Sequence, residues 1–378
     1  MTDRVRIAVA GLGAVAQAVH LPLLARRRDL FEVVAVCDLS PALCGALGDQ
    51  YGVPAGQRFG DVGEVVAKSD ADALLLLTSG SHAAAAEQAI RGGVPVFCEK
   101  PLAYTLGEAD RLAEAAAAVD GPGLLLGYMK ERDDAVLRLR ELLAGVEDVR
   151  AVEARVLHPP GTSQLGFANL LSPPGDVPDR VLGALRAREQ ELLDAAVGSA
   201  VPERFRRLYA HVVVSSLIHT TSLLRALFGG LADIDDVRVW PDAAFPPSVQ
   251  VSGTLAASVP AVLAWHFLDR YPAYRETLTV HHAGGSLELT FGTPYLLNAP
   301  TTLDVVEPSS TGERRSTYTS ATSSFENELV EFHRMVTAGA APVAGVGEGR
   351  TDIVTSQRIM RRLAEREGLT IGGEAASA

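Results

Sequence analysis

The sequence of 378 residues carries 34 basic and 46 acidic side chains, for a formal net charge of −12 at pH 7. Because this acidic balance repels polyanions, it argues against nucleic acid or anionic lipid as a partner. With 47% hydrophobic residues the chain can bury a large core, and its length favours two domains over one.

Targeting and redox signals favour a soluble, cytoplasmic protein. The start MTDRVRIAVAGLG lacks the layout of a signal peptide, and no stretch reaches the roughly 20 apolar residues of a membrane span. Cys37, Cys44 and Cys98 offer neither metal-ligand spacing nor an even number for disulfides, which favours buried thiols in a reducing compartment. Without a His-Glu-x-x-His motif or a ligand cluster, we predict no metal site.

Up to residue 130, short apolar runs alternate with alanine-rich segments of helical character. This alternation is typical of a parallel sheet covered by helices, so we predict a doubly wound α/β domain over residues 1–130. One helix is expected to begin at a Ser81 cap and to end at Gly92 and Gly93. The expected strands are RVRIAVA, FEVVAVCD, DALLLLT, PVFCEK and GLLLGYM.

The first of these strands runs into the loop Gly11-Leu12-Gly13-Ala14-Val15-Ala16, which opens a predicted helix. In that context the pattern Gly-x-Gly-x-x-Gly/Ala is typical of Rossmann domains that bind a dinucleotide. Gly11 permits the tight turn, Gly13 lets the backbone approach a pyrophosphate, and Ala16 keeps the helix close to the strand. The alternative is a purely structural glycine turn.

Asp38 ends the second strand, somewhat beyond the usual spacing of about 20 residues from the glycine loop. A carboxylate there accepts hydrogen bonds from the adenosine ribose hydroxyls and repels a 2′-phosphate, so NAD is favoured and NADP is left open. The alternative is a strand-end turn residue. The third strand leads into Thr78-Ser79-Gly80-Ser81-His82, where His82 either lines the nicotinamide side or begins the next helix.

Beyond residue 130 the pattern becomes a helix, a strand, a Pro- and Gly-rich stretch from His158 to Asp179, and two helical segments. The Pro- and Gly-rich stretch is either a lid or a long surface loop. Strands separated by turn residues then predict a large, mostly antiparallel sheet, so residues 131–378 should form an α+β domain. Two helices follow, and the tail GGEAASA is expected to fray. The expected strands are VRAVEARVLH, DVRVW, SVQVSGTLAA, AVLAWHFL, RETLTVHH, GSLELTF and TTLDVVE.

Several motifs together make the chain resemble the Gfo/Idh/MocA oxidoreductases, the family named for glucose-fructose oxidoreductase and inositol dehydrogenase. They are the glycine loop with His20 and Pro22, the Thr78 to His82 loop, Cys98-Glu99-Lys100-Pro101-Leu102, and Gly127-Tyr128-Met129-Lys130. The resemblance implies an open-faced sheet in the second domain. One side of that sheet would bind substrate and the other a second subunit, in a homodimer or homotetramer.

The resemblance places Lys100 between nicotinamide and substrate, where a cation can hydrogen-bond the reacting oxygen. Independently of the family, a lysine that ends a parallel strand and is fixed by a following proline is already a candidate site residue. The alternative is an exposed lysine in a turn. Glu99 joins it on the cofactor side, and the resemblance implies a cis peptide before Pro101.

The family's second motif, Asp-x-x-x-His, corresponds here to Ser215-Ser216-Leu217-Ile218-His219, so a serine replaces the aspartate. Serine cannot stabilise an imidazolium by charge, so proton transfer falls to Lys100, to His219 alone or to a nearby phenol. The alternative for His219 is a satisfied core histidine. The candidate substrate contacts are Tyr128, Lys130, Tyr209, His211 and Ser215, and less favoured polar and aromatic candidates are Trp265, His266, Tyr271, Tyr274, Arg275, Tyr295 and Asn298.

These observations predict hydride transfer between NAD, or NADP, and a secondary alcohol or ketone of a sugar, nucleotide-sugar or cyclitol, with Lys100 and His219 handling the proton. A carbohydrate-like small molecule is thus the expected partner. The missing aspartate motivates an alternative, a dinucleotide-binding sensor or regulatory protein without turnover. The intact Glu99-Lys100-Pro101 motif and glycine loop argue for the enzyme.

Overall fold

The computed structural model describes residues 4–172 and 175–378, so the first three residues and two residues of the predicted long loop lie outside the described part. The chain divides into two compact units. Unit 1 contains the residues up to Tyr128 with Ala168–Ser199 and Glu328–Ile353, and unit 2 contains Met129–Phe167, Ala200–Asn327 and Val354–Ala378. The division into domains at residue 130 stays a prediction.

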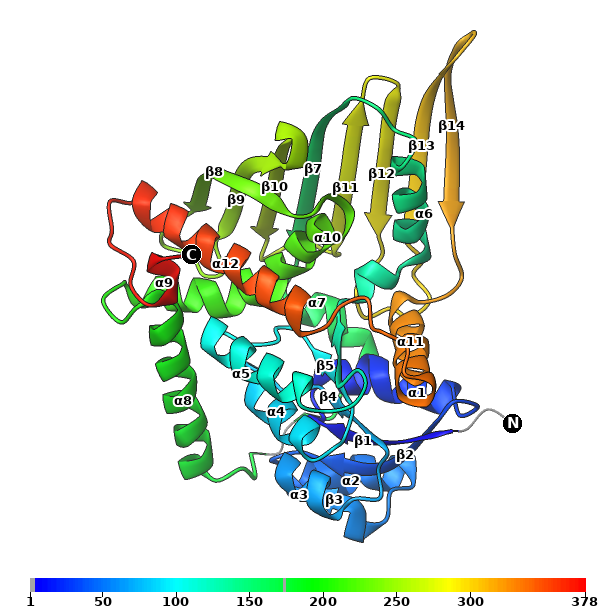
Figure 1. Cartoon of the computed structure of the whole chain (residues 1–378), viewed down its shortest axis with the longest axis vertical. Coiled ribbons are helices and arrows are strands. Elements are labelled where there is room, and N and C mark those ends of the chain that lie inside the picture. The colour runs from blue at the N-terminus through cyan, green and yellow to red at the C-terminus, as the bar shows by residue number, and fades with distance from the viewer. Residues whose placement is uncertain (1–3, 173–174) are drawn as a thin grey trace. The chain divides into compact units, whose positions relative to one another are not determined.

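Unit 1 is built on a six-stranded parallel sheet with the order β3-β2-β1-β4-β5-β6 (Figure 1). This order, which reverses between β1 and β4, is that of a Rossmann domain, so the predicted fold is confirmed. The two-residue β3 was not predicted because it is too short to show a pattern. The strands are β1 (Val5–Ala10), β2 (Phe31–Cys37), β3 (Arg58–Phe59), β4 (Ala73–Leu76), β5 (Val96–Glu99) and β6 (Leu124–Gly127).

Local signals explain where the helices of unit 1 begin. Ser40 caps α2 by accepting a hydrogen bond from the Leu43 amide, and Thr105 forms a capping box with Glu108 at α5. The predicted Ser81 cap is wrong: His82 is at the cap position of α4, and the Ser81 hydroxyl donates to Glu108 instead. The helices are η1 (Ala16–His20), α1 (Leu21–Arg26), α2 (Pro41–Tyr51), η2 (Ala55–Gln57), α3 (Val62–Lys68), α4 (Ala83–Arg91), α5 (Leu106–Ala117) and α8 (Asp179–Val197).

Unit 2 holds an eight-stranded sheet in the order β14-β13-β12-β11-β7-β10-β9-β8 (Figure 1). All neighbours are antiparallel except β7 and β10, which confirms the mostly antiparallel prediction. Strand β14 was missed because its residues are polar and exposed on both faces. The strands are β7 (Val149–His158), β8 (Leu231–Trp240), β9 (Ser248–Leu255), β10 (Pro260–Phe267), β11 (Arg275–His282), β12 (Gly285–Phe291), β13 (Thr302–Ser309) and β14 (Gly312–Thr319).

One face of this sheet is covered by helices, with α6 (Asp134–Leu143) and α10 (Ile218–Phe228) lying against it (Figure 1). Alternate residues of β9, β11 and β12 are buried, and those between them are mostly half-exposed. That alternation is the pattern of a sheet with one packed and one open face. Remaining helices of the chain are η3 (Met129–Arg132), α7 (Gly161–Leu165), η4 (Gly166–Ala168), η6 (Ala256–Ser258), α11 (Ser324–Ala338), α12 (Val346–Arg366) and η7 (Glu374–Ala376).

The helical stretch Glu203–Phe228 contains α9 (Glu203–Leu208), the π-helix η5 (Tyr209–Leu217) and α10. By length and composition it could cross a membrane, so the expectation that no stretch reaches this length is wrong. However, 56% of its most apolar window is buried inside the protein, as in the core helix of a soluble protein. A single helix of this kind is weak evidence for a membrane span.

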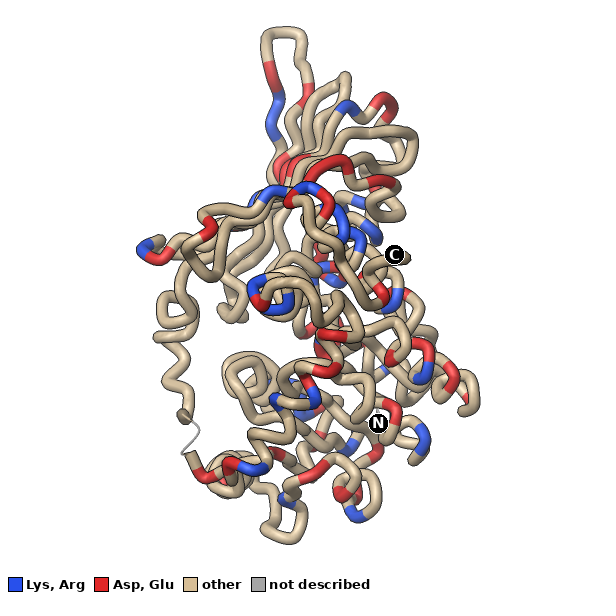
Figure 2. Tube along the Cα trace, turned by 90° about the vertical axis from the view of Figure 1, so that its left-hand side faces the viewer, with Lys and Arg blue, Asp and Glu red and all other residues tan. Residues whose placement is uncertain are grey.

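Charged residues of both signs are interspersed along both units (Figure 2). Within unit 2, arginines tie α12 to β8: Arg358 donates to the Leu231 carbonyl at 3.0 Å, and Arg366 pairs with Asp236 at 2.5 Å. The tail does not fray as expected, because Gln357 donates to Glu374 at 2.9 Å and Ala375 is fully buried.

Gly11 is the position where unit 1 depends most directly on a glycine. Its φ is +90°, and an added Cβ would lie 2.5 Å from the Thr78 amide nitrogen. We expect Gly11→Ala to lower the free energy of unfolding by more than about 2 kcal/mol, measured by urea denaturation. Gly13→Ala is the control, since an added Cβ there meets nothing within 4 Å. Equal stability of the two variants would contradict this reading.

Candidate active site

The glycine loop leaves a backbone surface open at the carboxyl end of β1. Gly11 and Leu12 are buried, whereas Gly13 is exposed and Ala14 and Val15 are half-buried. Because the space where a Gly13 Cβ would stand is empty, a pyrophosphate can approach the main chain there. Ala16 is fully buried, which lets η1 pack close to the sheet. The loop therefore fits a dinucleotide.

Asp38 follows β2 directly and turns its carboxylate toward the glycine loop. One oxygen accepts from the Leu12 amide at 2.8 Å and the other from the Ser40 amide at 2.9 Å. The carboxylate is thus fixed by two backbone donors at the edge where a Rossmann sheet binds adenosine. Its remaining lone pairs can still accept ribose hydroxyls.

The loop after β4 carries Thr78, which is half-buried, and Ser79, which is exposed. His82 is 1% exposed, and its two ring nitrogens lie 2.7 Å from the Thr78 carbonyl oxygen and 2.6 Å from the Pro101 carbonyl oxygen. Burial lowers the pKa of His82, and the two carbonyls partly offset this effect. His82 therefore links the Thr78 loop to the turn after β5 from inside the protein.

Lys100 stands at the carboxyl end of β5 and is half-buried. The peptide bond to Pro101 is cis, as the family resemblance implies. The Lys100 amide donates to the Glu99 carboxylate at 3.1 Å, so the acidic residue also fixes the backbone that carries the lysine.

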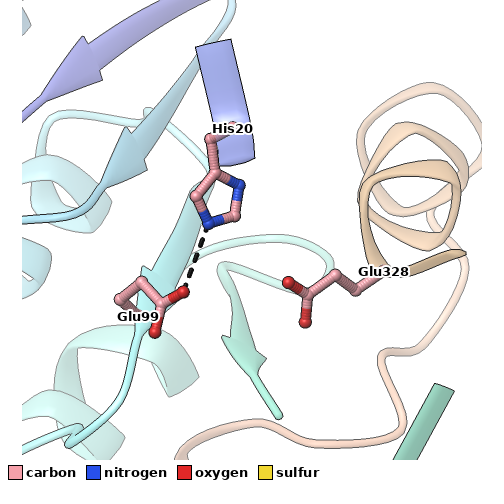
Figure 3. Close-up of side chains that lie close together, drawn as sticks. All are labelled: His20, Glu99 and Glu328. Carbon is pink, nitrogen blue, oxygen red and sulfur yellow. Dashed lines mark hydrogen bonds and ion pairs between the residues drawn. The ribbon is translucent and has the colours of Figure 1, made fainter. Parts of the chain in front are cut away.

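Glu99 belongs to a buried cluster with His20 and Glu328, whose side chains converge in Figure 3. The His20 Nε2 atom lies 3.2 Å from a Glu99 oxygen. Burial alone would raise the pKa of Glu99, but the hydrogen bond and charge of His20, together with Lys100, lower it. This pairing of His20 with Glu99 was not predicted, although His20 was noted as part of a motif.

In unit 2 the predicted histidine motif lies where η5 passes into α10. Ser215 and His219 are half-buried, Tyr209 is fully buried, and His211 is exposed beside the Phe245 ring. In an α-helix His211 would lie on roughly the same face as His219, but the π-helical turns of η5 depart from α-helical spacing. Segments of π-helix in proteins frequently mark functional sites.

A buried network crosses the same unit and includes Lys130 from the predicted set. The Lys130 Nζ lies 2.5 Å from a Glu276 oxygen, and the Tyr274 hydroxyl donates to the other Glu276 oxygen at 2.5 Å. Burial and the charge of Glu276 raise the pKa of Tyr274, so its phenol stays protonated. Neither Glu276 nor His158, which packs edge-on against Tyr274, was predicted.

The network continues toward the helical motif and borders a cavity. The Trp265 indole donates to the Ser216 hydroxyl at 2.8 Å, and the His158 and Trp265 ring centroids are 5.3 Å apart. The cavity has a volume of about 60 Å³. Its polar lining includes Lys130, Asp133, Glu276, Asn298, Thr301 and Ser323. Tyr128, also in the predicted set, is buried in unit 1.

Comparison with known proteins finds similarity in the N-terminal part of the chain. Residues 5–122 match the model of the Gfo/Idh/MocA oxidoreductase family, which has an NAD-binding Rossmann fold. Over 139 residues the chain is 37% identical to an inositol 2-dehydrogenase from Burkholderia ambifaria (strain MC40-6). Over these residues the N-terminal part is similar to the Gfo/Idh/MocA oxidoreductases. That alignment covers 36% of the chain and 41% of the relative's length.

Solved structures share the fold over nearly the whole length of this chain. An aldose-aldose oxidoreductase from Caulobacter crescentus, complexed with glycerol, has a TM-score of 0.71 at 18% identity, covering 97% of this chain and 98% of that one. A 3-ketoreductase from Actinomadura kijaniata, in complex with NADP and TDP-benzene, has a TM-score of 0.70 at 17% identity, covering 95% and 98%. At these identities the likeness shows the fold alone.

The buried Lys130–Glu276 ion pair gives a stability prediction. We expect Lys130→Met and Glu276→Gln each to lower the free energy of unfolding by about 3 kcal/mol, because each leaves a buried partner uncompensated. The double variant should lose less than the sum of the two. The exposed Lys68–Glu64 pair is the control, where the losses of the two single variants should be nearly additive. Additive losses at the buried pair, measured by urea denaturation, would show that the ion pair is not coupled.

The lowered pKa of His82 predicts acid sensitivity. The unfolded chain binds a proton on this ring at a higher pH than the folded chain does. The stability that His82 contributes is therefore fully present above about pH 6.5 and is lost as the pH falls below it. We expect His82→Gln to flatten the loss of unfolding free energy between about pH 6.5 and 5, by up to about 1.4 kcal/mol per pH unit. His281→Gln, at an exposed histidine, is the control, and identical slopes in all three proteins would refute the effect.

Proposed function

We propose that the chain is an NAD(P)-dependent oxidoreductase that transfers a hydride to or from a secondary alcohol or ketone of a sugar, nucleotide-sugar or cyclitol. The observation that carries the proposal is the open backbone at Gly13 beside the fixed carboxylate of Asp38, in a domain that matches the model of an NAD-binding family. The inositol 2-dehydrogenase among the relatives supports a carbohydrate-like substrate.

Cofactor binding is assigned to the carboxyl edge of the unit 1 sheet. Gly11 to Ala16 would receive the pyrophosphate and Asp38 the adenosine ribose, which favours NAD. Thr78, Ser79, Glu99 and Lys100 would lie on the nicotinamide side, while His82 holds their loops from behind. When bound, the cofactor supplies the hydride chemistry.

Lys100 and His219 are proposed to handle the proton of the reaction. A lysine ammonium can donate a hydrogen bond to the reacting oxygen and stabilise the negative charge that develops there. His219 would take up or release the proton, with Ser215 as a neutral hydrogen-bond partner in place of the family aspartate. Without that carboxylate, an imidazolium at His219 is less stabilised, so Lys100 would have the larger part in handling the proton.

The substrate contacts proposed in unit 2 come from η3, from the residue before β11 and from η5. Lys130 and Tyr274 present polar atoms that Glu276 fixes, and Tyr209, His211 and Ser215 come from η5. Polar groups held in one geometry suit recognition of a molecule rich in hydroxyls. We further propose that the open face of the sheet forms the contact of a homodimer or homotetramer.

Replacing Lys100 by Met tests the catalytic assignment. We expect turnover to fall by about 10²-fold or more, because the group that stabilises the developing charge is lost, while NADH affinity changes by less than about threefold. The measurements are nicotinamide absorbance for turnover and fluorescence titration for binding. Lys68→Met, at an exposed lysine of α3, is the control. Full activity of the Lys100 variant would remove this residue from the mechanism.

A panel of sugars, nucleotide-sugars and inositols, assayed with NAD(H) and NADP(H), tests the activity itself. Turnover of any member establishes the enzyme and its substrate class. Tight NADH binding without turnover across the panel would favour the alternative, a dinucleotide-binding sensor, which the serine at position 215 motivates.

A further inference from the structure

A segment distant in sequence lies against the proposed adenosine site within unit 1. Gln17, one residue beyond the glycine loop, donates to the Leu12 carbonyl at 2.8 Å and also faces Leu171. The Leu171 amide donates to the Gln17 side chain at 2.8 Å, and the Gln17 amide group donates back to the Leu171 carbonyl at 3.3 Å. Residues of the Pro- and Gly-rich stretch are thereby attached to the glycine loop.

The same stretch brings a second carboxylate to the turn that follows Asp38. An Asp176 oxygen accepts from the Ala42 amide at 2.9 Å, and the Ser40 hydroxyl also bonds to Asp176. These bonds lower the pKa of Asp176, so it is ionised at neutral pH. Asp38 already binds the Ser40 amide at 2.9 Å. Two carboxylates therefore share one short turn.

The bonds of Asp176 complete the N-terminus of α2. Pro41, at the first helical position, has no N–H, the Ala42 amide binds Asp176, and the Leu43 amide binds the Ser40 side chain. Free amides at a helix start attract anions, but here the donors are already used within the chain. An incoming phosphate would have to displace a carboxylate and remain beside another.

The location matters because the strand end at Asp38 is where a Rossmann domain distinguishes NAD from NADP. The 2′-phosphate of NADP extends from the ribose that the Asp38 position contacts, and enzymes that accept it provide a nearby arginine. Residues 38–43 read DLSPAL and contain no basic side chain. The turn thus combines two negative charges with an occupied helix N-terminus.

We propose that Asp176 is a second specificity-determining residue, which excludes the 2′-phosphate and makes the protein selective for NAD. The inference rests on the proposed dinucleotide-binding function. Asp38 acts by accepting the ribose hydroxyls. Asp176 acts by occupying the donors that a phosphate would need and by repelling its charge. The discrimination between NAD and NADP is therefore shared between Asp38, at the end of β2, and Asp176, which lies more than a hundred residues later in the sequence.

The experiment compares NADH and NADPH affinities by fluorescence titration in the full chain. Asp176→Asn keeps the shape and removes the charge, so we expect the ratio of NADPH to NADH dissociation constants to fall by about tenfold. NADH affinity itself should change little. Asp179→Asn is the matched control, because it removes the same charge from an exposed position at the start of α8. Thermal unfolding of each variant verifies that it is folded.

Gln17→Ala provides a second, independent variant, since it removes the attachment of Leu171 and should shift the ratio in the same direction. An unchanged ratio in Asp176→Asn, or an equal shift in Asp179→Asn, overturns the inference while leaving NADH binding as support for the proposed function. Equal affinity of the unaltered protein for NADH and NADPH also overturns it. If the unaltered protein binds neither dinucleotide, the proposed function fails and the inference fails with it.

Discussion

The close approach between the glycine loop and the end of β4 is the constraint on which unit 1 depends. Gly11 leaves no room for a side chain against Leu77 and Thr78, so the carboxyl ends of β1 and β4 are held together at main-chain distance. The Thr78 carbonyl then lies within reach of His82, whose other nitrogen faces the Pro101 carbonyl. The close backbone contact at Gly11 is therefore linked, through the buried imidazole of His82, to the turn that carries Lys100.

Unit 2 fixes its polar groups by a different means, because its strands are joined by turns and present side chains rather than helix ends. Glu276 is 2% exposed and is bonded at both oxygens, one to Lys130 and one to Tyr274. A buried carboxylate of this kind adds little net stability, but it restricts the orientation of both partners. Rigid orientation of a cation and a phenol is what recognition of a polyhydroxylated molecule requires.

Most of the fold could be predicted because its signals are local. Apolar residues repeat with the period of the element that they form, and caps and turn residues mark its ends. Strands β3 and β14 escaped because one is two residues long and the other is polar on both faces. The π-helical turns of η5 could not be predicted, since apolar periodicity assumes α-helical spacing. In the site, the glycine loop and Asp38 are visible as motifs, whereas Glu276 and the pairing of His20 with Glu99 depend on contacts between residues far apart in sequence.

The stretch that follows β7 shows why sequence motifs alone describe a cofactor site incompletely. Proline and glycine in that stretch predict a loop, but they do not indicate which surface the loop will cover. The Ser40-Pro41 start of α2 leaves one early amide, that of Ala42, without a partner from its own helix or cap. A carboxylate from any segment long enough to reach that amide satisfies the donor and complements the helix dipole. Both effects favour the contact of the loop with the start of α2. Because the Ala42 amide also lies beside the strand end proposed to contact the ribose, the bond that satisfies it also places a negative charge beside the proposed cofactor site.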